Sequence, residues 1–160
     1  MRITQWGEYG VHCMSFLSYQ ERQGRSTVGA AEIAEAQKIA VDYAQQILQR
    51  LRRGGLIESV RGPSGGYRLA HPAREITLQA ILVAAEGDTF EVICDHKPLQ
   101  MDCCAPGEYC GLRLIWRDLK AHIDQFLSDI TLERLTDQFY AEGSPVQIQS
   151  RPSTTSGQNV

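Results

Sequence analysis

The chain of 160 residues lacks any apolar run near the roughly 20 residues that a membrane-spanning helix requires. Its opening residues, MRITQWGEYG, also lack the apolar stretch of a signal peptide. We therefore expect a cytoplasmic protein that has no membrane partner. In that reducing compartment, its five cysteines are expected to bind metal or sense redox state rather than form disulfides.

The sequence also lacks the motifs of the enzyme classes that its composition would allow. There is no CxxC redox pair, and the only glycine-rich turn, residues 61–66, neither opens a helix nor ends in Gly-Lys-Ser/Thr. Apart from the proposed metal ligands, no acid/base constellation stands out. These absences argue against a thiol oxidoreductase, a nucleotide-dependent enzyme or a small metalloenzyme, and we expect no catalytic activity.

A uniformly basic surface is missing as well, because the formal net charge is −3. The charge is unevenly distributed along the chain. Residues 50–74 contain six arginines and one glutamate, a net charge of +5, whereas residues 86–110 contain six carboxylates and one lysine, a net charge of −5. Such a layout indicates one surface for a polyanion and a second surface for a different task.

Hydrophobic periodicity and turn residues predict a mainly α chain with a small β-hairpin. Helices are expected over residues 4–19, 30–37, 41–53, from Thr77 to about 85, 112–128 and 131–140, with hairpin strands at 56–60 and 67–69. This order is that of a winged helix-turn-helix followed by a long dimerisation helix. The expected division is a DNA-binding domain at 1–85, a cysteine-rich loop at 86–111, the dimerisation and C-terminal helices at 112–140, and a disordered tail at 141–160.

The long helix carries apolar residues at alternating steps of four and three. They are Leu112, Trp116, Leu119, Ile123, Phe126 and Ile130, broadened by Ile115 and Leu127. This spacing is typical of a coiled-coil seam and favours a homodimer, although the same stripe could pack inside one protomer.

The third predicted helix turns its apolar residues inward and polar residues outward. The outward set is Asp42, Tyr43, Gln45, Gln46, Gln49, Arg50 and Arg53. Glutamine amides can pair with adenine, and arginines can pair with guanine or phosphate. The wing turn consists of Arg61, Gly62, Pro63, Ser64 and Gly65, whose backbone N–H groups could approach phosphates. A basic amphipathic helix alone is usually a solvated surface, so the prediction of DNA binding depends on the helix and the wing together.

Four cysteines gather in one acidic loop that has no helix or strand period. They are Cys94, Cys103, Cys104 and Cys110. Clustered thiols outside regular elements indicate a soft-metal site, an iron–sulfur cluster or a redox switch. Zinc, with His96 as a further candidate, is an alternative, but paired CxxC knuckles are missing. The fifth cysteine, Cys13, is expected in the core.

Four short motifs resemble one family. They are LRRGGL at 51–56, SVRGPSGGY at 59–67, WRDL at 116–119 and DITL at 129–132. From residue 1 to about 135, the chain resembles the IscR/NsrR/RsrR group of bacterial winged-helix regulators. The resemblance implies a homodimer joined through the long helix, bound to a pseudo-palindromic double-stranded DNA operator. It also implies that Tyr43, Gln45 and Gln46 read the major groove and that Arg61 is the wing arginine.

The resemblance extends to the cysteine loop. Cys104 and Cys110 match the second and third cysteines of cluster-binding members, and Cys94 would be the first, across a longer loop. IscR-like members place a histidine ligand where this chain has Arg113. Glu8 and His12, spaced i and i+4 on one helical face, resemble the acidic ligand of NsrR and the Glu/His pair of RsrR.

Two ligand sets follow from this resemblance. A 2Fe–2S cluster would use Cys94, Cys110, Glu8 and His12, whereas a 4Fe–4S cluster would use Cys94, Cys104, Cys110 and Glu8. The presence of both Glu8 and His12 favours 2Fe–2S, and Cys103 is a possible extra thiol. We therefore expect a transcription regulator whose operator affinity depends on the cluster. The alternative is a cluster-free or zinc-bound thiol-switch regulator of the same fold.

Overall fold

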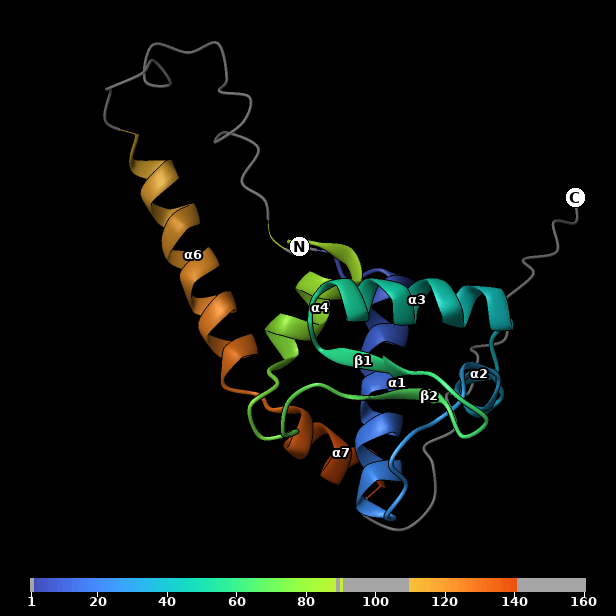
Figure 1. Cartoon of the computed structure of the whole chain (residues 1–160). Coiled ribbons are helices and arrows are strands. Elements are labelled where there is room, and N and C mark those ends of the chain that lie inside the picture. The colour runs from blue at the N-terminus through green and yellow to red at the C-terminus, as the bar shows by residue number, and fades with distance from the viewer. Residues whose placement is uncertain (1, 89, 91–109, 141–160) are drawn as a thin grey trace, which may run out of the picture.

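The computed structural model describes residues 2–88, 90 and 110–140 (Figure 1). The predicted thiols Cys94, Cys103 and Cys104, His96, and the predicted tail at 141–160 lie outside the described residues. Within the described ranges, no helix combines the length and the apolarity that a membrane crossing requires.

The first helix, α1, spans Gln5–Arg22, and Thr4 caps it by accepting a hydrogen bond from the Trp6 N–H at 3.2 Å. It continues about a turn beyond its predicted end at residue 19. The reason is tertiary: its last turns pack on the C-terminal helix, where Tyr19 stacks on Tyr140 with ring centroids 4.3 Å apart. Gly24, at φ +83°, then turns the chain away.

The helix-turn-helix consists of α2, Ala30–Gln37, and α3, Val41–Arg53, both with the predicted bounds. Lys38 ends α2 in the left-handed conformation at φ 54°, which makes the sharp turn into α3. The apolar face of α3 is fully buried; its residues are Ala44, Ile47, Leu48 and Leu51. These side chains fix which face of α3 remains available to solvent.

The wing is an antiparallel pair, β1 at Ile57–Val60 and β2 at Gly66–Leu69, in the register Ile57↔Leu69 to Val60↔Gly66. Both strands differ from the predicted bounds by one residue. Val28, ahead of α2, extends the sheet by exchanging two backbone hydrogen bonds with Tyr67, at 2.9 and 2.8 Å. The wing is therefore fastened at its base to the helix-turn-helix.

Two further helices complete the body around α1. Helix α4, Leu78–Glu86, begins at Thr77, whose hydroxyl accepts from the Ala80 N–H at 3.2 Å, and α7 spans Leu132–Tyr140. Residues of both helices join α1 and α3 in one hydrophobic core: Met14, Leu17, Ile47, Leu48, Ile81, Leu132 and Leu135 are among them. The C-terminal helix thus packs within the body, although it follows the long helix in sequence.

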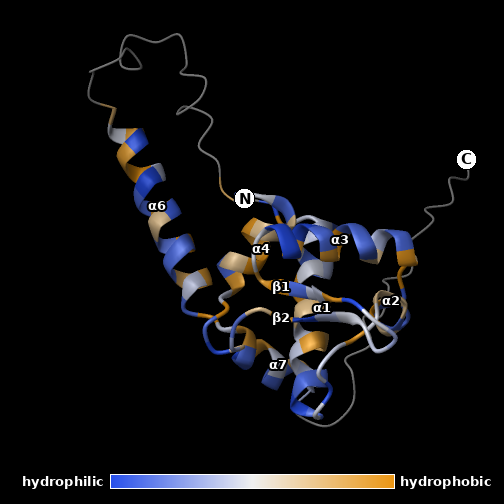
Figure 2. Ribbon diagram, viewed as in Figure 1, coloured by the Kyte–Doolittle hydropathy of each residue, from blue (hydrophilic) through white to orange (hydrophobic). Residues whose placement is uncertain are grey.

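The long helix α6, Gly111–Ser128, extends away from this body (Figure 1). Only Leu127 of its residues is buried, and Ile130 just beyond it is half-buried against the core. Several apolar side chains of the predicted stripe are open to solvent along this helix: Leu112, Ile115, Leu119 and Phe126 are exposed, Phe126 by 64%, while Trp116 and Ile123 are half-buried. Figure 2 shows hydrophobic and hydrophilic residues alternating along the projecting helix α6. The predicted fold class, a winged helix-turn-helix with a hairpin and a long helix, is confirmed.

Candidate nucleic-acid interface and metal ligands

The outer face of α3 is a row of polar side chains held by the buried face behind it. Asp42, Gln45, Gln46 and Gln49 are all exposed. Because Ile47 and Leu48 are sealed in the core, rotation of α3 about its axis would expose apolar surface and is resisted. The glutamine amides are therefore presented on a rigid element, as base reading requires.

Two residues from the predicted outward set instead hold α3 against its neighbours. Tyr43 is half-buried against Trp6 and Tyr9, with ring centroids 4.8 and 5.7 Å apart. The Arg50 guanidinium lies over the Trp6 ring, 4.1 Å from its centroid, and donates a 2.9 Å hydrogen bond to the Ala85 carbonyl. Burial is the main cause that raises the pKa of the Tyr43 hydroxyl. Both side chains therefore link α3 to α1, and Arg50 also links it to α4.

The wing turn is exposed and shaped by glycine. Arg61, Pro63 and Ser64 are exposed, and Gly62 has φ +123°, a conformation that other residues rarely adopt. A Cβ at Gly65 would lie 2.5 Å from the Val60 carbonyl oxygen, so this position also requires glycine. The Thr27 hydroxyl donates a 2.7 Å hydrogen bond to the Ser64 carbonyl and fixes the tip relative to α2.

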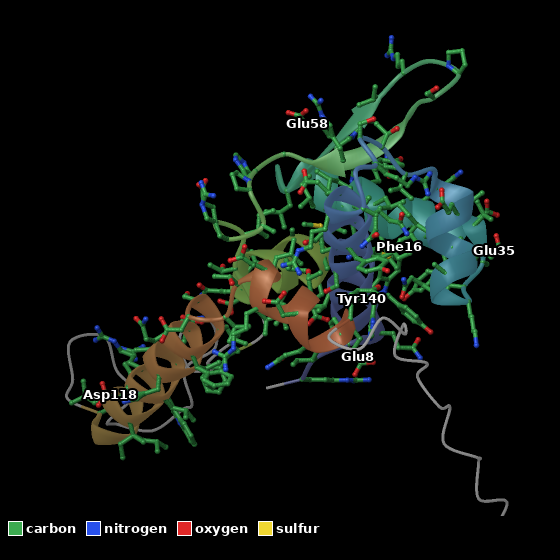
Figure 3. All side chains as sticks on the ribbon, turned by 90° about the horizontal axis from the view of Figure 1, so that it is seen from below. Glu8, Phe16, Glu35, Glu58, Asp118 and Tyr140 are labelled. Carbon is green, nitrogen blue, oxygen red and sulfur yellow. The ribbon has the colours of Figure 1, made fainter. Side chains whose placement is uncertain are left out.

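Charge on the wing is concentrated at its tip. Along the strands, Arg68 donates to Glu58 of the facing strand at 2.8 Å, so these two charges largely offset each other. Arg61, by contrast, belongs to the exposed turn. Figure 3 shows Glu58 on the wing and Asp118 on α6 at widely separated places, so the wing and the long helix present different surfaces.

A polar outer face on a buried recognition helix, together with a cationic, glycine-shaped wing, defines a winged helix-turn-helix DNA-binding protein. The model of the Rrf2 family, described as "Iron-dependent Transcriptional regulator", matches residues 3–138. The chain therefore belongs to the Rrf2 family of transcription regulators, the family of IscR-type proteins that its motifs resemble. It is a DNA-binding transcription regulator rather than an enzyme.

Named relatives and solved structures agree with this assignment. The chain is 37% identical over 137 residues to the HTH-type transcriptional regulator IscR of Serratia proteamaculans (strain 568), covering 86% of this chain and 80% of the relative. It is similar to the structure of T. potens IscR, with a TM-score of 0.65, 30% identity and coverage of 89% and 91% of the two chains. It is also similar to CymR, the global cysteine regulator of B. subtilis, with a TM-score of 0.67, 26% identity and coverage of 86% and 98%.

The structure places Glu8 and His12 one turn apart on α1. Glu8 is exposed near the start of the helix, and His12 is half-buried with its ring stacked on Phe139 of α7 at a centroid distance of 5.0 Å. Burial lowers the pKa of His12, and the nearby Glu8 carboxylate only partly opposes that shift. The neutral imidazole that results is the form that binds a metal.

Cys110 immediately precedes α6 as its half-buried N-cap residue. That end of α6 lies well away from α1 in the same protomer (Figure 1). Over residues 2–88, 90 and 110–140, no three histidine, cysteine, aspartate or glutamate side chains converge as a metal site requires. Among the described candidates, therefore, only Glu8 and His12 are brought together within one chain.

The predicted core cysteine is confirmed as a core residue. Cys13 is fully buried, and burial raises the pKa of its thiol to about 12. It is therefore a neutral thiol near pH 7.

Sequence reasoning missed the contacts that join α1 to the end of α4. Glu86 counted only as one carboxylate of the acidic segment, yet it binds the first turn of α1. The sequence contains only a weak signal of this contact. A threonine caps α1 and the small residue Gly7 follows it, which leaves room for a side chain from a distant part of the chain. Which side chain occupies that room depends on the tertiary fold.

Proposed function

We propose that this regulator controls its operator affinity through an iron–sulfur cluster bound by ligands from α1 and from the cysteine loop. The supporting observation is that Glu8 and His12 share α1 with Trp6 and Tyr9, which contact Tyr43 and Arg50 of α3. A change in the position of α1 would therefore act directly on the recognition helix.

The proposed ligands are Cys94, Cys110, Glu8 and His12 around a 2Fe–2S cluster. Carboxylate, neutral imidazole and thiolate are donors that iron accepts, and the half-buried imidazole of His12, whose pKa is lowered by burial, suits this task. The 4Fe–4S alternative would recruit Cys104 in place of His12. When bound, such a group supplies redox sensitivity, while the chain supplies the ligands and their spacing.

We further propose a homodimer in which α1 of one protomer faces the cysteine loop of its partner. Two facts support it: the exposed apolar stripe of α6, and the separation of the N-terminal end of α6, which Cys110 caps, from α1 in the same chain (Figure 1). Burial of the stripe against a second copy removes apolar surface from water. The dimer also gives two wings and two recognition helices for a pseudo-palindromic double-stranded operator in the cytoplasm.

In DNA binding, Gln45, Gln46 and Gln49 are proposed to read bases, with Asp42 and Tyr43 at the edge of the reading surface. The wing residues Arg61, Gly62, Pro63, Ser64 and Gly65 are proposed to contact the backbone or minor groove. Arg50 stays in the proposed interface, but it acts by holding α3 rather than by reaching bases.

Native mass spectrometry of anaerobically isolated protein, paired with operator titration, tests the cluster. Wild type should carry two irons and two sulfides per site, and Cys94→Ala or Cys110→Ala should lose both the iron and the cluster-dependent change in affinity. A Cys103→Ala/Cys104→Ala variant should keep the cluster if it is 2Fe–2S and lose it if it is 4Fe–4S. The proposal is refuted if the dimer contains no iron and if Cys94→Ala and Cys110→Ala leave its DNA binding unchanged. A dimer that contains zinc, or one that responds only to thiol oxidants, supports the alternative.

A mixed dimer tests the crossed arrangement of ligands. One protomer carries Glu8→Ala/His12→Ala, and its partner carries Cys94→Ala/Cys110→Ala. Crossed ligands leave one intact site, so the mixed dimer should hold half of the wild-type iron. Ligands from a single chain would leave no intact site and no iron.

A further inference from the structure

Glu86, the last residue of α4, binds the first turn of α1. Its Oε2 accepts a hydrogen bond from the Thr4 backbone N–H at 2.8 Å and a second one from the Thr4 hydroxyl. The same hydroxyl oxygen accepts from the Trp6 N–H at 3.2 Å, so the helix cap and the carboxylate form one connected set. We call these contacts the Glu86 clasp.

The clasp is closely fitted. A Cβ on Gly7 would lie 2.7 Å from Glu86 Oε1 and 2.9 Å from Leu82 Cδ2, so any larger residue would displace the carboxylate or the helix. Oε1 is buried and has no hydrogen-bond partner among the described residues. The N-terminal end of α1 carries partial positive charge, which favours a carboxyl group at this position. A buried polar atom left unpaired is unusual and calls for an explanation.

Residues next to Glu86 in the sequence form hydrogen bonds with two other helices, α3 and α6. Ala85 accepts the 2.9 Å hydrogen bond from Arg50 of α3, and Asp88 accepts from Lys120 of α6 at 3.0 and 2.9 Å. Within four residues, the end of α4 therefore contacts the recognition helix, the helix that carries Glu8 and His12, and the long helix. These contacts lie where the predicted cysteine loop, 86–111, begins.

The three contacts differ in strength. The Asp88 and Lys120 side chains are 47% and 33% exposed, so water screens their ion pair. The Glu86 contacts are half-buried or buried, and hydrogen bonds to a carboxylate in such a place are among the stronger ones. The Glu86 clasp is therefore stronger than the Asp88–Lys120 pair, and it is the contact of this group that holds α1.

We propose that Glu86 is a positioning residue, which holds α1 and its proposed ligands Glu8 and His12 in a fixed relation to the end of α4 and, through Ala85 and Arg50, to α3. The inference rests on the proposed function, because it assigns the clasp to the coupling between cluster and operator. A displacement of α1 at the proposed cluster site would be transmitted through the end of α4 to α3. Loss of the clasp should uncouple α1 from α3 without removing a ligand or a DNA contact.

The test compares Glu86→Leu, which has no acceptor, with Glu86→Gln, whose amide oxygen can still accept from Thr4. Glu21→Leu is the matched control, since Glu21 is an exposed glutamate at the other end of α1. Thr4→Val replaces the hydroxyl by a methyl group and so removes both its hydrogen bond to Glu86 and the cap on Trp6, whereas Thr4→Ser keeps both. These two variants serve if Glu86→Leu does not fold.

The first readout is amide hydrogen exchange of residues 4–8 in the cluster-free dimer. Because hydrogen bonds to charged groups are strong, their loss in Glu86→Leu should make the amides of residues 4–8 exchange roughly 10-fold faster than in wild type, or more. Thr4→Val should show a smaller rise in the same residues, while Glu86→Gln and Thr4→Ser stay closer to wild type. Unchanged exchange in both Glu86→Leu and Thr4→Val overturns the inference.

The second readout is the ratio of operator affinities between loaded and cluster-free dimers. In wild type it should fall within the roughly 5- to 150-fold range of allosteric coupling, and in Glu86→Leu it should approach one. If Glu86→Leu weakens operator binding by the loaded and the cluster-free dimers equally, the ratio stays at its wild-type value. Glu86 would then be a merely structural residue, and the inference would be overturned. If wild-type protein binds its operator equally well with and without the cluster, the proposed function itself is wrong. This result is obtained before any variant is measured, so it is distinct from failure of the inference about Glu86.

Discussion

Helices α3 and α6 are both amphipathic, but they differ in what covers their apolar side chains. Every apolar residue on the inner face of α3 is buried by α1, α4 and the rest of the body, whereas α6 leaves Leu112, Ile115, Leu119 and Phe126 open. The difference teaches that the DNA-binding body buries its own apolar surface within one chain, whereas the open stripe of the long helix supports the proposed dimer. Both helices can obey the same hydrophobic pattern, because the pattern does not specify which chain supplies the covering surface.

The largest effect should come from breaking the sealed face of α3. Leu48→Ala should lower the free energy of unfolding by about 2–5 kcal/mol, because it leaves a cavity in a fully buried site. Chemical denaturation at fixed protomer concentration measures this. Gln49→Ala, one residue further on the outer face, should change stability by no more than about 0.5 kcal/mol. Equal effects of the two changes would remove the distinction between the faces.

Charges on the open face of α6 should separate the protomers and leave the body folded. The double change Ile115→Asp/Leu119→Asp should raise the dimer dissociation constant at least about 100-fold, near 2.7 kcal/mol, because carboxylates resist burial. Sedimentation velocity reports the dissociation, and near-ultraviolet circular dichroism reports the fold. Arg117→Asp, off the apolar stripe of the same helix, is the control. A double variant that remains as dimeric as this control would show that α6 is not the interface.

Outward changes on the body should affect DNA binding while leaving the fold intact. Gln46→Ala and Arg61→Ala should each cost about 1–3 kcal/mol of operator affinity. The glutamine variant should also relax discrimination between operator and scrambled DNA, whereas the arginine variant should weaken both and reduce the salt slope by about one. Fluorescence anisotropy at several salt concentrations measures this, with Arg134→Ala on α7 as the charge-matched control. If Arg134→Ala weakens operator binding as much as Arg61→Ala does, the proposed DNA-binding surface is wrong.

The smallest effect concerns the contact between the body and α6. The hydrogen bond from Lys120 lowers the pKa of Asp88, so its contribution is present above the unfolded carboxyl pKa and is lost as pH falls through the lower folded value. Because the pair is partly exposed and screened by water, Asp88→Asn should cost no more than about 0.5 kcal/mol at pH 7. The difference from wild type should shrink as the pH falls below the unfolded carboxyl pKa, as a series of denaturation curves from neutral to acid pH would show. A larger, pH-independent loss would point to a packing effect instead.

Periodicity and turn chemistry predicted the elements of this fold well. The bounds of α2 and α3 matched because Gly29, the turn after Gln37 and Gly54 punctuate a clear apolar pattern. The end of α1 was predicted too early, since its last turns depend on Tyr19 meeting Tyr140 rather than on local sequence. Local signals therefore set the element types, and tertiary packing adjusted one end.

The candidate site was less accessible to prediction. A helical wheel places Tyr43 and Arg50 at the border of the buried face of α3, and their direction is decided by Trp6, far away in sequence. Glu86 was hidden for a similar reason, since its partner Thr4 precedes it by 82 residues. The loop thiols Cys94, Cys103 and Cys104 lie outside the described residues, so the ligand sets remain predictions.

The position of Cys110 at the start of α6 has a mechanical consequence. Eighteen residues of α-helix span about 27 Å, so a tilt of roughly 10° about the far end would move Cys110 by about 5 Å. That displacement is about twice the length of a typical bond from a metal ion to a protein ligand. A small rotation of the long helix would therefore be enough to take this sulfur out of the proposed cluster site.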